Sequence, residues 1–165
     1  MLKIEVATFN DIPSIVTIGK EIWEEHYTPI IGSDQVSYML EKFQSKSAIE
    51  KQIIDGYDYF KVLDREELIG YLATEKRPSD DEKIVFISKF YIRNDQRGKG
   101  YGSKCLKFLL NHYSNEDAFQ LLVNKYNYDS IKAYKAWGFK SVDSVKIDIG
   151  GGFFMDDYVM KLYID

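Results

Sequence analysis

The feature that most constrains this chain is a glycine-rich run, Arg97-Gly98-Lys99-Gly100-Tyr101-Gly102, between a predicted strand (84–92) and a predicted helix (103–113). Glycines at such a junction let backbone N–H groups turn toward one point and approach a ligand without a Cβ clash. The first turn of the helix, starting near Ser103, adds unpaired N–H donors and the positive end of its dipole. The run therefore predicts a pyrophosphate site, with extra positive charge from Arg97 and Lys99.

The spacing of the glycines separates this loop from two other phosphate-binding loops. It is not a mononucleotide P-loop, because Gly102 is followed by Ser103 and no glycine precedes it at the required distance. It is not the dinucleotide fingerprint, because the glycines alternate as G-x-G-x-G and several predicted strands precede them. A plain turn between a strand and a helix is the alternative without a ligand.

Hydrophobic periodicity along the rest of the chain predicts an α/β fold (α+β in some schemes). Strands are expected over 2–7, 57–63, 68–74, 84–92, 119–123, 139–149 and 153–164. Helices are expected from 10 or 11 to 23, over 35–43, around 49–54, over 103–113 and over 130–137, and a polar loop over 77–83. The main elements follow the order β-α-α-β-β-β-α-β-α-β-β, which leaves out the short helix around 49–54. The expected result is a mixed, twisted sheet of about seven strands with helices on both faces, in a single domain over residues 1–165.

Composition narrows the class of protein. The net charge of −4 argues against general nucleic-acid binding, which needs a basic face. With Cys105 alone no intrachain disulfide forms, and without a signal-peptide pattern or an 18-residue apolar window we expect a cytoplasmic location and no membrane association. His26 and His112 do not cluster with Cys105 at metal-ligand spacing, so no metal site is expected. A monomer and a homodimer both stay open.

Two motifs in this order resemble the GCN5-related N-acetyltransferase (GNAT) superfamily. The family's loop pattern, Arg or Gln then x-x-Gly-x-Gly or Ala, is matched by Arg97, Gly100 and Gly102. Its second pattern is an Asn after the next strand, a helix carrying Tyr, and then Gly-Phe. That pattern is matched by Asn127, Ala133, Tyr134, Gly138 and Phe139. The resemblance extends over essentially the whole chain and implies an acetyl-coenzyme A–dependent N-acetyltransferase, a transferase enzyme.

The resemblance also implies which residues hold acetyl-coenzyme A (acetyl-CoA). The strand before the loop would offer backbone groups to the pantetheine arm, the loop would hold the pyrophosphate, Asn127 would contact the arm, and Tyr134 would lie near the sulfur. The expected cofactor-binding residues are Phe90, Tyr91, Ile92, Arg97, Gly98, Lys99, Gly100, Tyr101, Gly102, Ser103, Asn127 and Tyr134.

Acetyl transfer to an amine needs a neutral amine, a polarised thioester carbonyl, close approach and a protonated leaving thiolate. The family performs it by direct attack, with backbone N–H groups near Phe90 and Tyr91 as the expected polarising donors. Tyr134 is the candidate general acid; a core tyrosine that packs its helix on the sheet is the alternative. Cys105 is interpreted as a packing residue.

The general base is left open by the sequence. Many relatives place a Glu on the strand before the loop, where this chain has Ser88. The alternatives are Glu24, Glu25, Glu75 and His26, each of which is equally compatible with a solvated surface position.

The acceptor is expected to be a small amine, most of all a polyamine such as spermidine or spermine. Aromatic and acidic residues gather at 23–27 and in the last strand pair, 153–158, and this combination suits an alkylammonium chain. These segments look like bacterial spermidine/spermine-type acetyltransferases of the superfamily. The expected acceptor-binding residues are Glu24, His26, Tyr27, Glu75 and Asp156. A protein N-terminus, an amino acid and an aminoglycoside stay open as acceptors, as does a non-catalytic acyl-CoA sensor.

Overall fold

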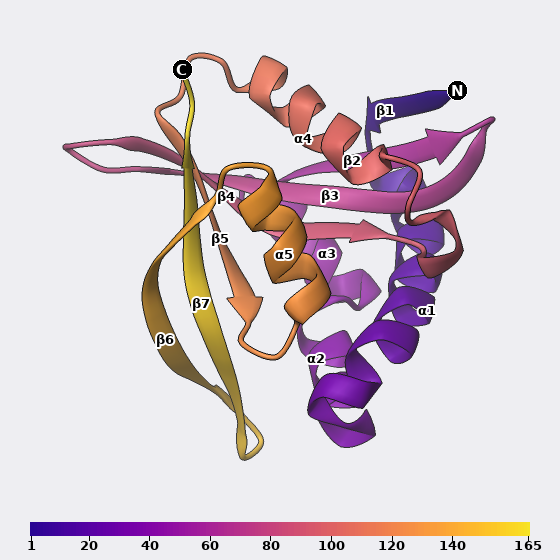
Figure 1. Ribbon diagram of the computed structural model, residues 1–165. Helices are drawn as coiled ribbons and strands as arrows, with labels where there is room; N and C mark the ends of the chain where they lie inside the picture. Colours follow the sequence, from indigo (N-terminus) through magenta and orange to yellow (C-terminus); the bar gives the residue numbers. More distant parts are fainter.

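A computed structural model describes all of residues 1–165, which form one seven-stranded mixed sheet with the strand order β1-β2-β3-β4-β5-β7-β6 (Figure 1). The strands are β1 (Leu2–Val6), β2 (Asp58–Asp64), β3 (Glu67–Pro78), β4 (Lys83–Ile92), β5 (Ala118–Asn124), β6 (Lys140–Gly150) and β7 (Phe153–Tyr163). The helices are α1 (Ile12–Ile31), α2 (Ser33–Phe43), α3 (Lys46–Ile54), α4 (Tyr101–His112) and α5 (Tyr128–Ala136). The predicted fold class is confirmed, and α3 is the short helix left out of the predicted order.

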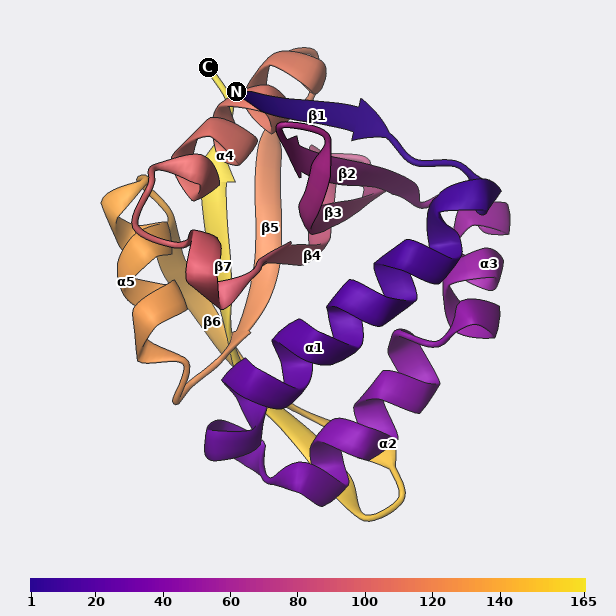
Figure 2. The same ribbon diagram turned by 90° about the vertical axis from the view of Figure 1, so that its right-hand side faces the viewer.

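The helices cover the sheet on both faces (Figure 2). Helices α4 and α5 lie on one face, over a core that includes Phe60, Leu72, Leu109 and Phe119. Helices α1, α2 and α3 lie on the other face, where Ile15 and Ile49 are among the fully buried side chains. No helix combines the length and the apolar character that crossing a membrane requires.

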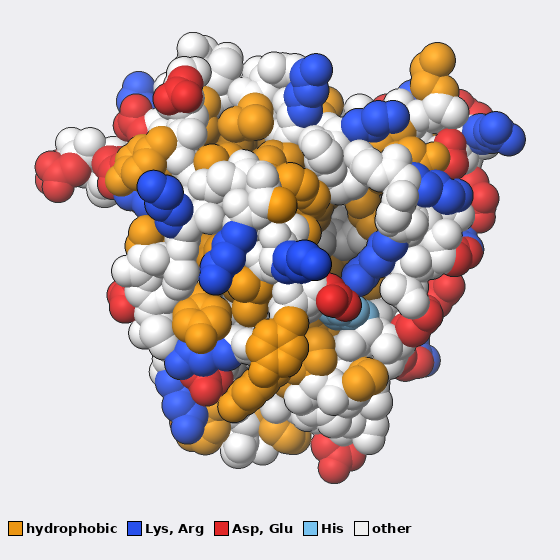
Figure 3. Space-filling view, viewed as in Figure 1, with side chains coloured by type: hydrophobic (Ala, Val, Ile, Leu, Met, Phe, Trp, Pro, Cys, Tyr) orange, Lys and Arg blue, Asp and Glu red, His pale blue; other side chains and the backbone are white.

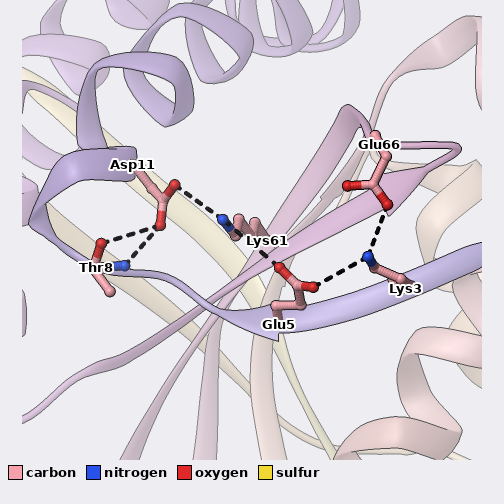
Figure 4. A network of polar contacts seen from close by, with 6 residues as sticks. All are labelled: Lys3, Glu5, Thr8, Asp11, Lys61 and Glu66. Carbon is pink, nitrogen blue, oxygen red and sulfur yellow. Dashed lines mark hydrogen bonds and ion pairs between the residues drawn. The ribbon is translucent and has the colours of Figure 1, made fainter.

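A polar network fixes the start of α1 against β1 and β2 (Figure 4). Asp11 accepts a hydrogen bond from the backbone N–H of Thr8 at 2.9 Å and from Lys61 Nζ at 3.1 Å. The Thr8 bond, more than the nearby ammonium, holds the pKa of Asp11 below its usual value. Lys3 and Glu5 on β1 continue the network toward Lys61.

Helix α1 and the hairpin of β3 and β4 are longer than the sequence predicted. Helix α1 continues past Trp23 to Ile31. Strands β3 and β4 take up both ends of the predicted polar loop over 77–83, because Arg77 pairs with Ile84 and Pro78 with Lys83, and only residues 79–82 stay outside the strands. The side chain of Arg77 also lies over the Phe86 ring, 3.9 Å from its centre, which helps to extend this hairpin.

Two irregularities in β4 create the space for a site. Lys89 pairs with Ala73 and Ile87 with Thr74, so Ser88 is an extra residue in a β-bulge. Strand β4 is parallel to β5 and pairs with it only from Ile84 to Phe86; beyond that point the two strands separate. The remaining edge of β4 faces a gap between the strands.

Candidate active site

The glycine loop lies at the end of β4 and forms the start of α4. Gly98 and Gly100 have φ values of 78° and 77°, a left-handed conformation that suits glycine. The backbone N–H groups of Gly98, Lys99 and Gly100 have no acceptor within the protein. Together with the first turn of α4 they offer converging donors, which is the arrangement that a pyrophosphate requires.

A cavity of about 300 Å³ opens beside this loop. Phe90 and Ile92 of β4 form one wall, and Ala133 and Tyr134 of α5 form the other with Trp137, which directly follows α5. Figure 3 shows a hollow in this face of the molecule, bordered by Lys and Arg side chains. An elongated ligand with an anionic group at the loop and an uncharged arm between β4 and α5 fits this shape and charge.

Gly102 is required for a different reason from the two loop glycines. A Cβ atom at this position would lie 2.7 Å from Cη2 of Trp137. The absence of a side chain therefore lets α4 approach α5 closely and sets the width of the cavity between them.

The loop side chains divide between the cavity and the surrounding protein. Arg97, Tyr101 and Ser103 line the cavity, as do the three glycines. Tyr101 also donates a hydrogen bond from its Oη to Asp64 at 2.9 Å, which fixes α4 against β2. Lys99 does not line the cavity; its Nζ donates to Gln96 Oε1 at 3.0 Å.

A second cavity, of about 380 Å³, lies on the other side of the gap between β4 and β5. Its walls come from α1, α2, β4, β5 and β7, and they are rich in aromatic side chains. These are Trp23, Tyr27, Phe43, Tyr57, Phe86, Phe90, Tyr91 and Tyr134. Phe90 and Tyr134 line both cavities, so the two spaces meet at these rings.

Tyr134, the predicted general acid, lies between the two cavities. Its hydroxyl has no hydrogen-bond partner within the protein, and it lies at the junction of the two cavities. Burial raises the pKa of Tyr134, so the hydroxyl keeps its proton at neutral pH. A protonated, unpartnered hydroxyl at this junction can donate a proton to a group on either side.

Asn127 is part of the wall of the second cavity. It lines that cavity, with 2% of its surface exposed, and does not line the cavity beside the loop. Its Oδ1 lies 3.0 Å from His26 Nε2, and its Nδ2 lies 3.5 Å from Tyr27 Oη. The sequence predicts Asn127 as a cofactor contact; in the structure its side chain lies between α1 and α5.

His26 connects Asn127 to the glycine loop. Its Nδ1 lies 3.5 Å from Nη1 of Arg97, and a guanidinium can only donate, so Nδ1 accepts and Nε2 carries the proton. Burial, more than any other factor, lowers the pKa of His26, and Arg97 adds to the effect. His26 is therefore a neutral link at neutral pH, and it does not line either cavity.

The carboxylate in the second cavity is Asp157, which the sequence analysis did not single out. Only 3% of Asp157 is exposed, and its side chain has no hydrogen-bond partner. Burial raises its pKa to about 6, and Asp156 adds to the effect. The predicted residue, Asp156, points to the other side of β7 and pairs with Lys125 at 3.0 Å. Alternation along the strand, with Met155 also lining the cavity, is the signal that identifies Asp157.

The other predicted acceptor residues fall in different places. Tyr27 lines the cavity, whereas Glu24 and Glu75 do not. Glu24 is exposed on α1, 3.8 Å from Lys20, and Glu75 pairs with Arg77 at 2.9 Å. The cavity also contains a buried lysine, Lys89, which the sequence analysis passed over.

The bulge at Ser88 explains the position of Lys89. Ile87 packs in the core under α4 and α5, and without a bulge Lys89 would share its face. The extra residue reverses the alternation, so Lys89 and Tyr91 face α1 and α2, while Phe90 and Ile92 face the loop cavity. The ring of Tyr91, whose backbone is the part expected to contact the cofactor, therefore lines the second cavity.

Comparisons with known proteins agree with this geometry. No curated protein sequence matches the chain. The PaiA N-acetyltransferase of Thermoplasma acidophilum, solved with coenzyme A, superposes with a TM-score of 0.82 at 16% identity over 99% of both chains. YncA of Salmonella typhimurium, a putative acetyltransferase solved with acetyl-CoA, superposes with a TM-score of 0.68. It is 17% identical, and the match covers 100% of this chain and 95% of YncA. The phosphinothricin acetyltransferase of Sinorhizobium meliloti, solved with acetyl-CoA, superposes with a TM-score of 0.70. It is 21% identical, and the match covers 99% of this chain and 88% of that protein.

At these identities the structural likeness shows a shared fold. The family profile described as "Acetyltransferase (GNAT) family" adds sequence evidence, because it matches residues 20–139, well over half of the chain. The protein therefore belongs to the GNAT family of acetyltransferases.

Proposed function

We propose that the protein transfers an acetyl group from acetyl-CoA to the primary amine of a small molecule held in the second cavity, here called the acceptor cavity. The observation that carries this proposal is the meeting of the two cavities at Tyr134 and Phe90. Bound acetyl-CoA supplies an activated acetyl group. The two reactants enter from opposite sides, which favours direct attack in a ternary complex without a covalent enzyme intermediate.

The residues beside the loop suit coenzyme A. The free N–H groups of Gly98 to Gly100 and the guanidinium of Arg97 would hold the pyrophosphate. The apolar walls formed by Phe90, Ile92 and Trp137 would enclose the pantetheine arm. Coenzyme A or acetyl-CoA in the structures of the relatives supports the same assignment.

Two side chains are proposed to move protons. Tyr134 would donate the proton of its Oη to the departing sulfur, because its raised pKa keeps it protonated until that charge develops. Asp157 would take the proton of the acceptor ammonium, directly or through a water molecule. A carboxyl pKa of about 6 keeps Asp157 ionised at neutral pH and makes it a stronger base than an ordinary aspartate.

A polyamine is the acceptor class that the sequence favours. The carboxylate of Asp157 and the electron-rich faces of Trp23 and Tyr27 would receive one alkylammonium group. A cytoplasmic location and a monomeric or homodimeric state stay predictions.

The test is mass-spectrometric detection of acetyl transfer from acetyl-CoA to a panel of spermidine, spermine, amino acids, peptides and aminoglycosides. Initial rates varied in both substrates are expected to give intersecting lines, as a ternary complex requires. Binding of coenzyme A without turnover of any amine would refute the enzyme and favour an acyl-CoA sensor.

A further inference from the structure

The end of the acceptor cavity next to α2 and α3 contains a buried lysine without a counter-ion. Lys89 is 3% exposed, and no carboxylate lies within ion-pair distance of its Nζ. Its Nζ donates hydrogen bonds to the backbone oxygen of Phe43, at 2.7 Å, and to Tyr59 Oη. Both partners are uncharged, and an ammonium has three N–H groups, so one donor is left for the cavity.

Gln44, beside Lys89, also has unused donors. Its Oε1 accepts a hydrogen bond from Tyr71 Oη at 2.8 Å, which orients the amide. Its Nε2 has no acceptor within the protein, although the residue is only 4% exposed and lines the cavity. A buried amide with two free N–H groups next to a buried ammonium forms a donor-rich surface.

Arg77 adds a second cation at the rim of the same end. Its guanidinium is held over Phe86 and pairs with Glu75, which leaves other N–H groups free. The carboxylate that lines the cavity, Asp157, comes from β7 on a different wall. A second ammonium group of an acceptor would therefore meet Lys89 and Arg77 instead of a carboxylate.

We propose that the acceptor carries a carboxylate in addition to its primary amine, and that Lys89 and Gln44 bind that carboxylate while Asp157 receives the amine. This inference rests on the proposed acetyl transfer and specifies its substrate class as an amino acid in the broad sense. A carboxylate is a monoanion, which matches the single charge that Lys89 supplies.

Burial of Lys89 makes its binding of a carboxylate depend on pH. It lowers the pKa of Lys89 to about 7, and no other titrating group contributes to that shift. The ionisable groups around this end of the cavity are Tyr57 just before β2, Tyr59 on β2, Tyr71, Glu75 and Arg77 on β3 and Tyr91 on β4, and none on α2 or α3 at the cavity wall. A bound carboxylate would raise the pKa of Lys89, so binding near pH 7 takes up part of a proton, and affinity falls as the pH rises above 7.

The experiment compares matched acceptors that differ by one carboxylate. One series pairs ω-amino acids from β-alanine to 6-aminohexanoate with alkylamines of one carbon fewer. A second series pairs leucine with isoamylamine and phenylalanine with phenethylamine, and spermidine represents the polyamines. We expect the best acid to exceed its matched amine at least ~10-fold in kcat/KM at pH 7, the scale of one charge-assisted hydrogen bond.

Variants then test the role of Lys89 itself. Lys89→Met is expected to lower kcat/KM for the acid by ~10- to 100-fold and for its matched amine by less than ~3-fold. Lys89→Gln, which keeps a donor but no charge, should fall between Lys89→Met and wild type. Lys76→Met is the control, because Lys76 is exposed on the neighbouring strand and pairs with Glu116 at 3.4 Å. Affinity for coenzyme A, measured on each variant, reports whether the fold is intact.

If the variants do not fold, measurements on wild-type protein alone still test whether the acceptor carries a carboxylate. The preference for acid over amine should decline between pH 6 and pH 8.5, and calorimetry in two buffers should show proton uptake on binding of the acid. Acetylation of amines or spermidine without preference for the acids, or equal losses for both members of a pair in Lys89→Met, overturns this inference and leaves the proposed function standing. No acetylation of any amine overturns the proposed function instead.

Discussion

Replacing Asp157 with Asn is expected to remove a pH-dependent loss of stability and to slow catalysis. The residue is 3% exposed and its carboxylate faces the cavity without a hydrogen-bond partner in the protein, and burial raises its pKa from 3.8 to about 6. Each pKa unit corresponds to about 1.4 kcal/mol. Keeping Asp157 ionised in the folded state therefore costs about 3 kcal/mol at pH 7, and an Asn side chain does not carry this cost.

The sign of the pH dependence follows from proton binding. Between pH 3.8 and about 6 the folded protein holds the Asp157 proton, whereas the unfolded chain has released it. Stability contributed by this residue is therefore present at low pH, is lost as the pH rises through that window, and is constant above it. Other carboxylates, such as Asp11 with its lowered pKa, act in the opposite direction. Because wild type and Asp157→Asn share these carboxylates, their contribution cancels when the stability of one protein is subtracted from that of the other.

Urea unfolding of both proteins from pH 4 to pH 8 measures this difference. The stability of Asp157→Asn relative to wild type should rise by about 3 kcal/mol between pH 4 and pH 7. An unpaired amide adds an offset of about 1–3 kcal/mol that does not change with pH, so the slope is the test. Asp156→Asn, which alters the neighbouring carboxylate paired with Lys125, should change stability by less than about 0.5 kcal/mol throughout. A flat difference for Asp157→Asn would refute the assignment of a buried ionised carboxylate.

The same pair of variants tests catalysis, and three further substitutions test other parts of the site. Asp157→Asn should lower kcat/KM ~10²-fold or more, the scale of a general base, with Asp156→Asn close to wild type. Tyr134→Phe should lower kcat ~10²-fold or more without weakening coenzyme A binding, and an unchanged kcat would exclude Tyr134 as the acid. Gly102→Ala should cost about 1–3 kcal/mol in urea unfolding and weaken coenzyme A binding, because the new Cβ meets Trp137 at 2.7 Å. Cys105→Ala should keep full activity, and the native thiol should resist maleimide, since burial raises its pKa to about 12.

Most of the fold was predictable because local patterns and tertiary structure agree. Alternation identified the strands, helical spacing identified all five helices, and the glycine loop marked the junction of β4 and α4. The ends of elements were less accurate where tertiary contacts decide them. The extension of the hairpin to Pro78, for example, depends on strand pairing and on the Arg77–Phe86 contact.

The two ends of the site differ in how well the sequence predicts them. The cofactor side is contiguous in sequence, and its requirements are properties of the backbone, so glycine spacing reveals it. The acceptor side joins residues from distant segments, and its chemistry depends on which side chains face inward. Along β7, alternation turns Asp157 into the acceptor cavity, whereas the predicted Asp156, one residue earlier, faces the other side of the strand.

Lys89 shows why the face on which a side chain lies is hard to predict in β4. A bulge at Ser88 reverses the alternation in the middle of the strand, and no local pattern announces it. Strict alternation would place Lys89 with Ile87 under α4 and α5, where a charged side chain would be excluded from the core. The position where the family resemblance leads us to expect a Glu, Ser88, is thus the bulge itself, and the ionisable side chains at the acceptor cavity include the next residue, Lys89, and Asp157 of β7.

A chain of contacts through Arg97, His26, Asn127 and Tyr27 connects the glycine loop to the acceptor cavity. Arg97 belongs to the glycine loop, His26 and Tyr27 to α1, and Asn127 to the start of α5. A pyrophosphate bound at the loop would compete with His26 Nδ1 for the guanidinium of Arg97, because both are acceptors for the same donors. Any resulting movement of the imidazole passes to Asn127, which holds the Tyr27 hydroxyl at the acceptor cavity. We therefore expect this four-residue connection to influence the order in which the two substrates bind.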